Sequence, residues 1–299
     1  MKSLRIAAIG ECMVEFSAQS GSDYRLGFAG DTFNTAVYLA RLLGDFHRIS
    51  YVTCLGDDAL STQMLEHFRS HQLDTTCVFI ESGSAPGAYL INNDAQGERS
   101  FTYWRQNSAA TKLMAANRFD VLREHLAQFD LIYLSGISLA ILAPADQEKL
   151  IGLLKVLNLP IAFDPNYRPQ LWQDVSRAQR LCEQVSEISQ YLLTTFDDDK
   201  LMWQSHSPQQ ALVTWQDKTR GEIIIKNGEH PALLYKDDVS EEISPGEIIQ
   251  PIDTTGAGDS FNAAYLAARL TGSNMQQAAA LAHGLAGKVI GHRGAILPI

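Results

Sequence analysis

The chain has 299 residues, and 45% of them are hydrophobic, which is enough to bury one large core or two modest ones. Its 34 aspartates and glutamates outnumber its 24 lysines and arginines, so the net charge is -10. A negative field of this kind repels phosphate backbones and anionic membranes. The composition therefore argues against nucleic acid and membrane surfaces as partners, and an anionic ligand such as ATP would depend on local donors.

The first residues run directly into a strand-like stretch, 4–9, without a cleavage-site pattern. No apolar stretch approaches the ~20 residues that span a bilayer, so we expect a cytoplasmic protein. The four cysteines are scattered and form no CxxC pair, which indicates neither a disulfide framework nor a metal site. They are expected to be buried free thiols: Cys12, Cys54, Cys77 and Cys182.

Short, continuously apolar runs recur along the chain and alternate with helical patterns. Continuous rather than alternating hydrophobicity is typical of strands buried on both faces. The alternation predicts an α/β fold with a mostly parallel sheet and helices on both faces. The expected strands are 6–9, 49–53, 131–134, 159–163, 191–193 and 221–225, and the expected helices are 34–43, 60–71, 147–157, 175–190 and 275–290.

Two regions, about 12–28 and 87–105, break this rhythm because polar and apolar residues alternate in them. Alternation around a turn at 93–97 predicts a hairpin with one face in water. We therefore expect a single domain, 1–299, with a small β-sheet lid formed from these two regions. The acidic stretch 236–246 is expected to be a surface strand and loop.

The most informative segment is Asp253-Thr-Thr-Gly-Ala-Gly-Asp259, which opens into a strong helical pattern from Asn262. A glycine-rich turn that opens into a helix aims several unpaired N–H groups at one point, and that point favours an anion. Gly256 and Gly258 lack Cβ atoms, so the backbone can adopt positive φ and approach a phosphate closely. The segment predicts a phosphate cradle.

Asp259 is predicted to lie in the first turn of that helix, where the macrodipole should keep it ionised at neutral pH. A carboxylate beside an anion cradle is poorly explained as a phosphate ligand. It is well explained as a base that accepts the proton of an attacking hydroxyl. For this short motif alone, a helix cap without a catalytic role remains the alternative.

The segment resembles the Asp-Thr-x-Gly-Ala-Gly-Asp signature of the PfkB or ribokinase-like family of carbohydrate kinases. Gly30-Asp31-Thr-Phe-Asn34 resembles the sugar-binding signature of the same family. The resemblance implies a Rossmann-like sheet with a β lid, and ATP and Mg²⁺ as cofactors. It also implies a homodimer through the lid, and catalysis by Asp259 with the amides of Gly256, Ala257 and Gly258 around the transferred phosphate.

The family's Asn-x-x-Glu motif, which is associated with Mg²⁺ and phosphate, has only acidic approximations here, in the stretch 193–199 with Asp197 and Asp198. The metal ligands therefore stay unassigned. The stretch 223–229 resembles the nucleotide-contacting loop of the family. The resemblance implies nucleotide contacts from Asn166, Lys226 and Gly228 together with Gly256 and Gly258, although a lone lysine at a strand end is more often simply solvated.

Two arginines suggest that the substrate is a sugar acid, because the guanidinium fork can bind a carboxylate bidentately. Arg105 ends a predicted lid strand, and Arg168 follows the strand near 161–164, where the carboxyl ends of parallel strands line a cleft. Taken alone, each arginine is more often a surface residue or part of a structural ion pair.

The residues around these arginines resemble the 2-keto-3-deoxygluconate kinase branch of the family, in Tyr103-Trp-Arg105 and Asp164-Pro-Asn-Tyr-Arg168. Without the resemblance, the lid tyrosines fit apolar packing equally well. The resemblance implies that the substrate is held by Gly30, Asp31, Asn34, Tyr89, Tyr103, Arg105 and Arg168.

We therefore expect ATP-dependent phosphorylation of 2-keto-3-deoxygluconate to 2-keto-3-deoxy-6-phosphogluconate. One alternative is another sugar kinase of the family, of the fructokinase or ribokinase type. A second is a non-catalytic sugar-binding or dinucleotide-binding protein. The second is disfavoured because no GxGxxG follows the first strand, where Ile9-Gly-Glu-Cys-Met stands instead.

Overall fold

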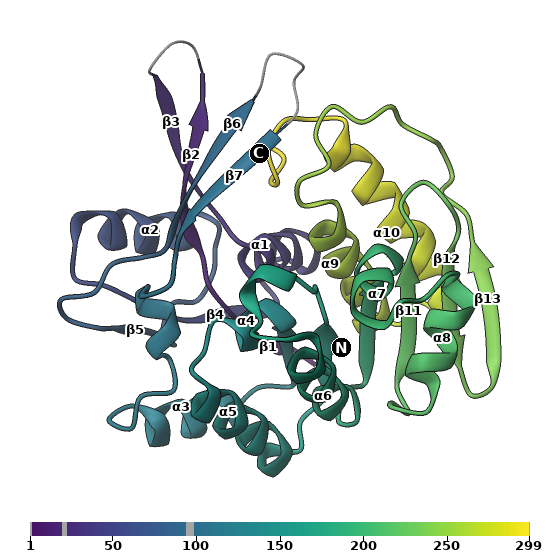
Figure 1. Cartoon of the computed structure of the whole chain (residues 1–299), viewed down its shortest axis with the longest axis horizontal. Helices are drawn as coiled ribbons and strands as arrows, with labels where there is room; N and C mark the ends of the chain where they lie inside the picture. Colours follow the sequence, from purple (N-terminus) through teal and green to yellow (C-terminus); the bar gives the residue numbers. More distant parts are fainter. Residues whose placement is uncertain (1, 20–22, 94–98, 299) are drawn as a thin grey trace.

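A nine-stranded sheet forms the body of the protein, in a computed structural model that describes residues 2–19, 23–93 and 99–298 (Figure 1). The strand order is β13-β12-β11-β10-β9-β8-β1-β4-β5, and only the pairs β11–β12 and β12–β13 are antiparallel. The strands are β1 (Arg5–Ile9), β4 (Arg48–Leu55), β5 (Val78–Ile80), β8 (Leu131–Ser135), β9 (Ile161–Asp164), β10 (Tyr191–Thr195), β11 (Glu222–Lys226), β12 (Ala232–Lys236) and β13 (Val239–Ile243).

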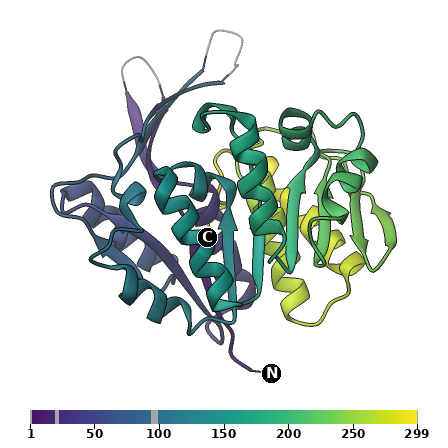
Figure 2. The same ribbon diagram turned by 60° about the horizontal axis from the view of Figure 1, so that its bottom comes forward.

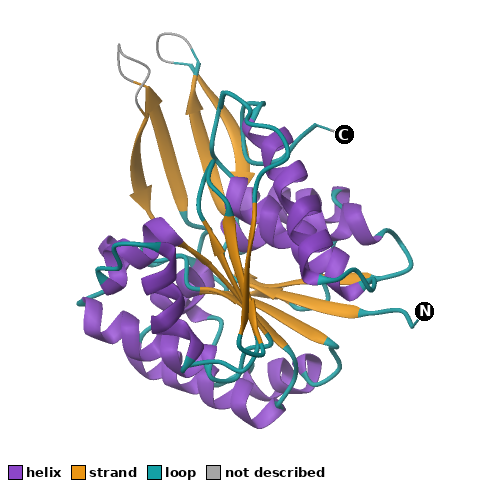
Figure 3. Ribbon diagram, turned by 90° about the vertical axis from the view of Figure 1, so that its right-hand side faces the viewer, coloured by secondary structure: helices purple, strands orange, loops and turns teal. Residues whose placement is uncertain are grey.

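Helices cover both faces of this sheet, as the edge-on view in Figure 3 shows. Successive strand residues point to opposite faces, so Ile6 and Ala8 join the core under α1, α9 and α10, whereas Ala7 and Ile9 join the core under α5 and α6. Burial on both faces is the physical reason for the continuous apolar runs. The helices are α1 (Asp31–Leu43), α2 (Ala59–Ser70), α3 (Phe119–Leu126), α4 (Gly136–Ala140), α5 (Pro144–Leu157), α6 (Val175–Ser186), α7 (Phe196–Trp203), α8 (Pro208–Gln216), α9 (Ala257–Leu270) and α10 (Met275–Ile290).

The expected elements are present, and the differences lie at their ends. The helix expected over 175–190 ends at Ser186, because the following residues turn into β10 and the Gln190 N–H donates to the Ile161 carbonyl at 2.8 Å. The strand expected from 159 begins at Ile161. All four cysteines are buried free thiols, as expected.

A second sheet of four strands projects from the body, at the top of Figures 1 and 2. Its order is β3-β2-β6-β7, with β2 (Met13–Ala18), β3 (Tyr24–Ala29), β6 (Ala88–Asn93) and β7 (Arg99–Trp104). The pairs β2–β3 and β6–β7 are antiparallel and the central pair β2–β6 is parallel. The turn expected at 93–97 lies almost wholly outside the described residues. The predicted α/β class with a small second sheet is confirmed.

None of the helices in the described ranges combines the length and the apolar character that crossing a membrane would require.

Candidate active site

A cleft of about 850 Å³ separates the small sheet from the carboxyl ends of the parallel strands. The fold brings together there every residue for which the sequence predicted a role in catalysis, sugar binding or nucleotide binding. They are Gly30, Asp31, Asn34, Tyr89, Tyr103, Arg105, Asn166, Arg168, Lys226, Gly228, Gly256, Ala257, Gly258 and Asp259.

The glycine-rich turn leads directly into α9, with Gly256 in the left-handed region at φ 78°. A Cβ there would lie 2.7 Å from the Ala295 carbonyl oxygen, so only glycine fits. The Ala257 N–H already donates to the Thr254 carbonyl at 3.2 Å. The amides of Gly258 and Asp259, which no helical carbonyl can reach, are therefore better placed than that of Ala257 to meet an anion.

Asp259 lies in the first turn of α9, and its Oδ2 accepts a hydrogen bond from Nδ2 of Asn34 in α1 at 2.8 Å. Burial, followed by the charge of Asp31, raises the pKa of Asp259 to about 8. This shift opposes the expectation that the helix macrodipole keeps Asp259 ionised at neutral pH. The macrodipole is outweighed by the loss of solvent and by the acidic neighbours Asp31 and Asp164.

The loop before α1 carries the predicted sugar signature. A Cβ on Gly30 would lie 2.2 Å from the Glu11 carbonyl oxygen, so the loop needs glycine for close packing rather than for an unusual φ. Asp31 accepts a hydrogen bond at its Oδ2 from Nδ2 of Asn166 at 2.8 Å. The Asn166 side chain thus points to the sugar signature, although the resemblance implied a nucleotide contact.

Both arginines line the cleft, and both are also ion-paired. Arg105 donates through Nε to Oε2 of Glu11 at 2.8 Å, and Arg168 donates through Nη1 to Oδ1 of Asp198 at 3.0 Å. The Arg105 pair is buried, whereas the Arg168 side chain keeps 43% of its surface exposed. The sequence did not reveal either carboxylate partner, because neither is near its arginine in the chain.

Lys226 ends β11 on the floor of the cleft. Its Nζ donates to Oδ2 of Asp164 at 2.8 Å and to Oδ1 of Asn262 at 2.9 Å. The amide of Asn262 in turn donates to Asp164 at 2.6 Å and to the hydroxyl of Tyr133 at 3.0 Å. The charge of Lys226 is therefore neutralised by Asp164, and this buried network was not foreseen.

Six carboxylates and three cations line the cleft, which leaves it formally negative by three charges. An anion such as ATP therefore needs an accompanying cation to enter it. Burial raises the pKa of Asp198 to about 6 and leaves it largely ionised at neutral pH. Within the described ranges, no three His, Cys, Asp or Glu side chains cluster as a ready-made metal site.

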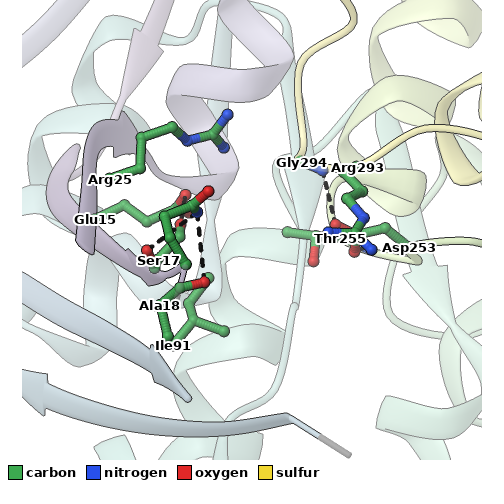
Figure 4. A pocket seen from close by; sticks show the side chains of 10 residues that line it. Glu15, Ser17, Ala18, Arg25, Ile91, Asp253, Thr255, Arg293 and Gly294 are labelled. Atoms are coloured by element: carbon green, nitrogen blue, oxygen red, sulfur yellow. Dashed lines mark hydrogen bonds between the residues drawn. The ribbon is translucent and has the colours of Figure 1, made fainter. Parts of the chain in front are cut away.

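A smaller cavity of about 120 Å³ lies between the small sheet and the loops of the body (Figure 4). Glu15 and Arg25 face it from the sheet, and Asp253 and Arg293 face it from the body. The Asp253 carboxylate accepts hydrogen bonds from the amides of Thr255 at 2.9 Å and Gly294 at 2.7 Å. The first aspartate of the signature thus anchors the glycine-rich turn to the C-terminal loop.

Known proteins resemble this chain over nearly its whole length. A family model described as pfkB family carbohydrate kinase matches residues 3–299. The 2-dehydro-3-deoxygluconokinase of Escherichia coli (strain K12) is 40% identical over 305 residues, which cover 99% of this chain and 98% of that protein.

Two solved structures share the fold at lower identity. A 2-dehydro-3-deoxygluconokinase from Thermotoga maritima has a TM-score of 0.84 at 20% identity, covering 99% of this chain and 96% of that one. A putative ribokinase II from E. coli, in complex with ATP and Mg²⁺, has a TM-score of 0.83 at 21% identity, covering 98% and 94%.

Proposed function

The chain belongs to the pfkB family of carbohydrate kinases and is an ATP-dependent sugar kinase, and from this premise we propose that its sugar is 2-keto-3-deoxygluconate, also called 2-dehydro-3-deoxygluconate. The product would be 2-keto-3-deoxy-6-phosphogluconate. The observation that carries this proposal is the pair Arg105 and Arg168, two guanidinium groups that line the same cleft as Asp259. A neutral sugar offers no carboxylate to two arginines, whereas a sugar acid does.

In the proposed reaction, Asp259 accepts the proton of the sugar 6-hydroxyl as that oxygen attacks the γ-phosphorus of ATP. The oxygen–phosphorus bond to the sugar forms while the bond between the β,γ-bridging oxygen and the γ-phosphorus breaks, so ADP leaves with the electron pair. Asn34 holds Oδ2 of Asp259 through the 2.8 Å hydrogen bond and so keeps the carboxylate oriented toward the cleft. The amides of Gly258 and Asp259 face the negative charge that develops on the transferred group.

A magnesium ion fits this cleft. Mg²⁺ is usually held by one or two carboxylates together with water and substrate phosphates, so a ready-made cluster of protein ligands is not required. Asp197 and Asp198 line the cleft and are the residues we propose to hold it. When bound, the ion would neutralise phosphate charge in a cleft that is itself negative.

The proposal is tested with a coupled assay of ADP release from Mg²⁺-ATP, comparing 2-keto-3-deoxygluconate, gluconate, fructose and ribose on the wild type and on Arg168→Ala. We expect turnover of the keto-deoxy acid above the others and a loss of about tenfold or more in its kcat/KM in the variant, since a charge-assisted hydrogen bond is removed. Preferential turnover of fructose or ribose would keep the kinase and overturn the sugar acid.

We also infer that residues 1–299 form one kinase domain in which the sheet of β2, β3, β6 and β7 acts as a lid and pairs with a second copy of the chain. The pairing register puts Tyr24, Leu26, Phe16, Leu90 and Trp104 on the face opposite the cleft. Trp104 is 56% exposed and Tyr24 is 47% exposed, which leaves an apolar face to cover. Light scattering tests this: a wild-type monomer at micromolar concentration, or a Leu26→Glu dimer as stable as the wild type, would contradict it.

A further inference from the structure

The chain passes between the body and the small sheet four times, and all four passages meet at one residue, Glu11. Glu11 itself lies in the first passage, between β1 and β2. Gly30 lies in the second, and a Cβ there would lie 2.2 Å from the Glu11 carbonyl oxygen. Gly87 lies in the third, and a Cβ there would lie 2.7 Å from Oε1 of Glu11. Arg105 and Ser108 belong to the fourth.

The carboxylate of Glu11 is buried, with 2% of the residue exposed. Its Oε2 accepts a hydrogen bond from Nε of Arg105 and forms an ion pair with Nη2, and its Oε1 accepts a hydrogen bond from the Ser108 hydroxyl. This arrangement engages one edge of the guanidinium. Nη1 and the second N–H of Nη2 are the donors of Arg105 that Glu11 does not hold, and Arg105 lines the cleft.

Glu11 is also in contact with the cleft at its own position, where the carboxyl end of β1 meets the hinge of the lid. Breaking a buried ion pair leaves the surviving charge unpaired, so its geometry is held firmly.

We propose that Glu11 is a positioning residue for the sugar: it holds the Nε edge of Arg105, so that the remaining Nη1–Nη2 edge is the one presented to the substrate carboxylate, and it does so where the four passages that form the lid hinge meet. The inference rests on the proposed function, because it assumes that Arg105 meets the acid group of the sugar. Nη1 and the second N–H of Nη2 can still bind a carboxylate bidentately, so the position of Glu11 sets how well this fork reaches the substrate carboxylate.

Two conservative variants separate position from charge. Glu11→Asp keeps the charge but withdraws the carboxylate by one methylene, and Glu11→Gln keeps the reach but removes the charge. Positioning predicts that Glu11→Asp raises the KM for the sugar about tenfold, the effect of one misplaced charge-assisted hydrogen bond. Positioning also predicts that the KM of Glu11→Gln for the sugar stays within about threefold of the wild-type value, since the amide oxygen can still accept a hydrogen bond from Arg105.

Glu81→Asp is the matched control. Glu81 pairs with Arg118, which is buried, and neither residue lines the cleft. This variant should lower Tm and leave the KM for the sugar and for ATP unchanged. A double variant completes the test: in an Arg105→Ala background, Glu11→Asp should add nothing to the sugar KM, because Glu11 acts through Arg105.

The outcomes are distinct. Equal KM values for the sugar in Glu11→Asp and the wild type, or effects that add to those of Arg105→Ala, would overturn the inference. A larger effect from Glu11→Gln than from Glu11→Asp would replace positioning by charge and overturn it as well. A wild type that does not phosphorylate 2-keto-3-deoxygluconate defeats the proposed function instead, and the Glu11 variants are then compared on the sugar that it does phosphorylate.

Discussion

The two ends of the cleft are built in different ways. At the phosphate end, one short segment supplies the glycine-rich turn, the amides and Asp259, and the helix that follows holds them in place. At the sugar end, Arg105 and Arg168 come from distant segments, and each is oriented by a carboxylate from a third part of the chain, Glu11 or Asp198. Under the proposed function, the chemistry depends on a local motif and the selectivity depends on tertiary contacts.

This difference explains why a family can keep one reaction and change its sugar. A local motif keeps its geometry wherever the turn and helix form. A contact between distant segments changes when any of its partners changes, so the sugar end is the part that substitutions can retune. The division between the two ends would be contradicted if a change at the phosphate end altered sugar selectivity, or if a change at the sugar end altered the chemical step.

The largest effect is expected from Asp259→Asn, which should lower kcat by ~10² to 10⁴, the usual scale for loss of a general base.

The same substitution, Asp259→Asn, should raise Tm at alkaline pH. The folded-state pKa of Asp259, about 8, lies above its ordinary value, so the folded state holds an extra proton between about pH 4 and 8 and loses stability as pH rises through that window. Asparagine cannot ionise, so its Tm should exceed that of the wild type by at least ~2 °C at pH 8.5.

Calorimetry at about pH 4 provides the control, because the wild-type carboxyl is then protonated in the folded state and about half protonated in the unfolded state, so the two Tm values should nearly converge. Turnover by Asp259→Asn at the wild-type rate, with folding intact, would remove Asp259 from the role of base. A lower Tm in the variant at pH 8.5 would show that the carboxylate stabilises the fold.

A smaller effect, confined to the phosphate end, is expected from two glycine substitutions two residues apart. Gly256→Ala places a methyl 2.7 Å from the Ala295 carbonyl oxygen at φ 78°, so it should cost about 1–3 kcal/mol of stability and lower kcat about tenfold or more by displacing the turn. Gly258→Ala places a methyl in open space, with Nζ of Lys226 nearest at 3.7 Å. It should leave Tm unchanged and raise the KM for ATP, because a methyl would stand where the backbone meets phosphate.

Thermal unfolding and initial rates distinguish the pair. If Gly258→Ala binds ATP as the wild type does, the phosphate does not approach the helix at that residue. A changed KM for the sugar in either variant would contradict the claim that the two ends of the cleft have separate roles.

The parts of this architecture that the sequence predicted are those encoded over short distances. Continuous apolar runs placed the strands because both faces of the sheet are buried, and the glycine spacing located the turn that opens α9. The raised pKa of Asp259 was not anticipated, since its burial and its neighbours Asp31 and Asp164 arise only through tertiary folding. The ion pairs of Glu11 with Arg105 and of Asp198 with Arg168 were missed for the same reason, because a carboxylate partner distant in the chain leaves no periodic or spacing signal.

The smallest effect concerns the pH dependence. Asp259 must be deprotonated to act as a base, and its pKa is about 8, so kcat/KM for the sugar should fall as pH decreases below about 8. Asp31→Asn removes the largest cause of the raised pKa after burial. It should shift this acid limb about one pH unit lower, whatever it does to the absolute rate.

Rates for both proteins across about pH 6 to 10 check this shift. Glu81→Gln, a charge change outside the cleft, is the control and is expected to leave the limb in place. An unmoved limb in Asp31→Asn would mean that burial and Asp164, not Asp31, hold the proton on Asp259. Asp31 and Asp259 would then be electrostatically independent, and the link between α1 and Asp259 would consist of the hydrogen bonds from Asn34 and Thr35.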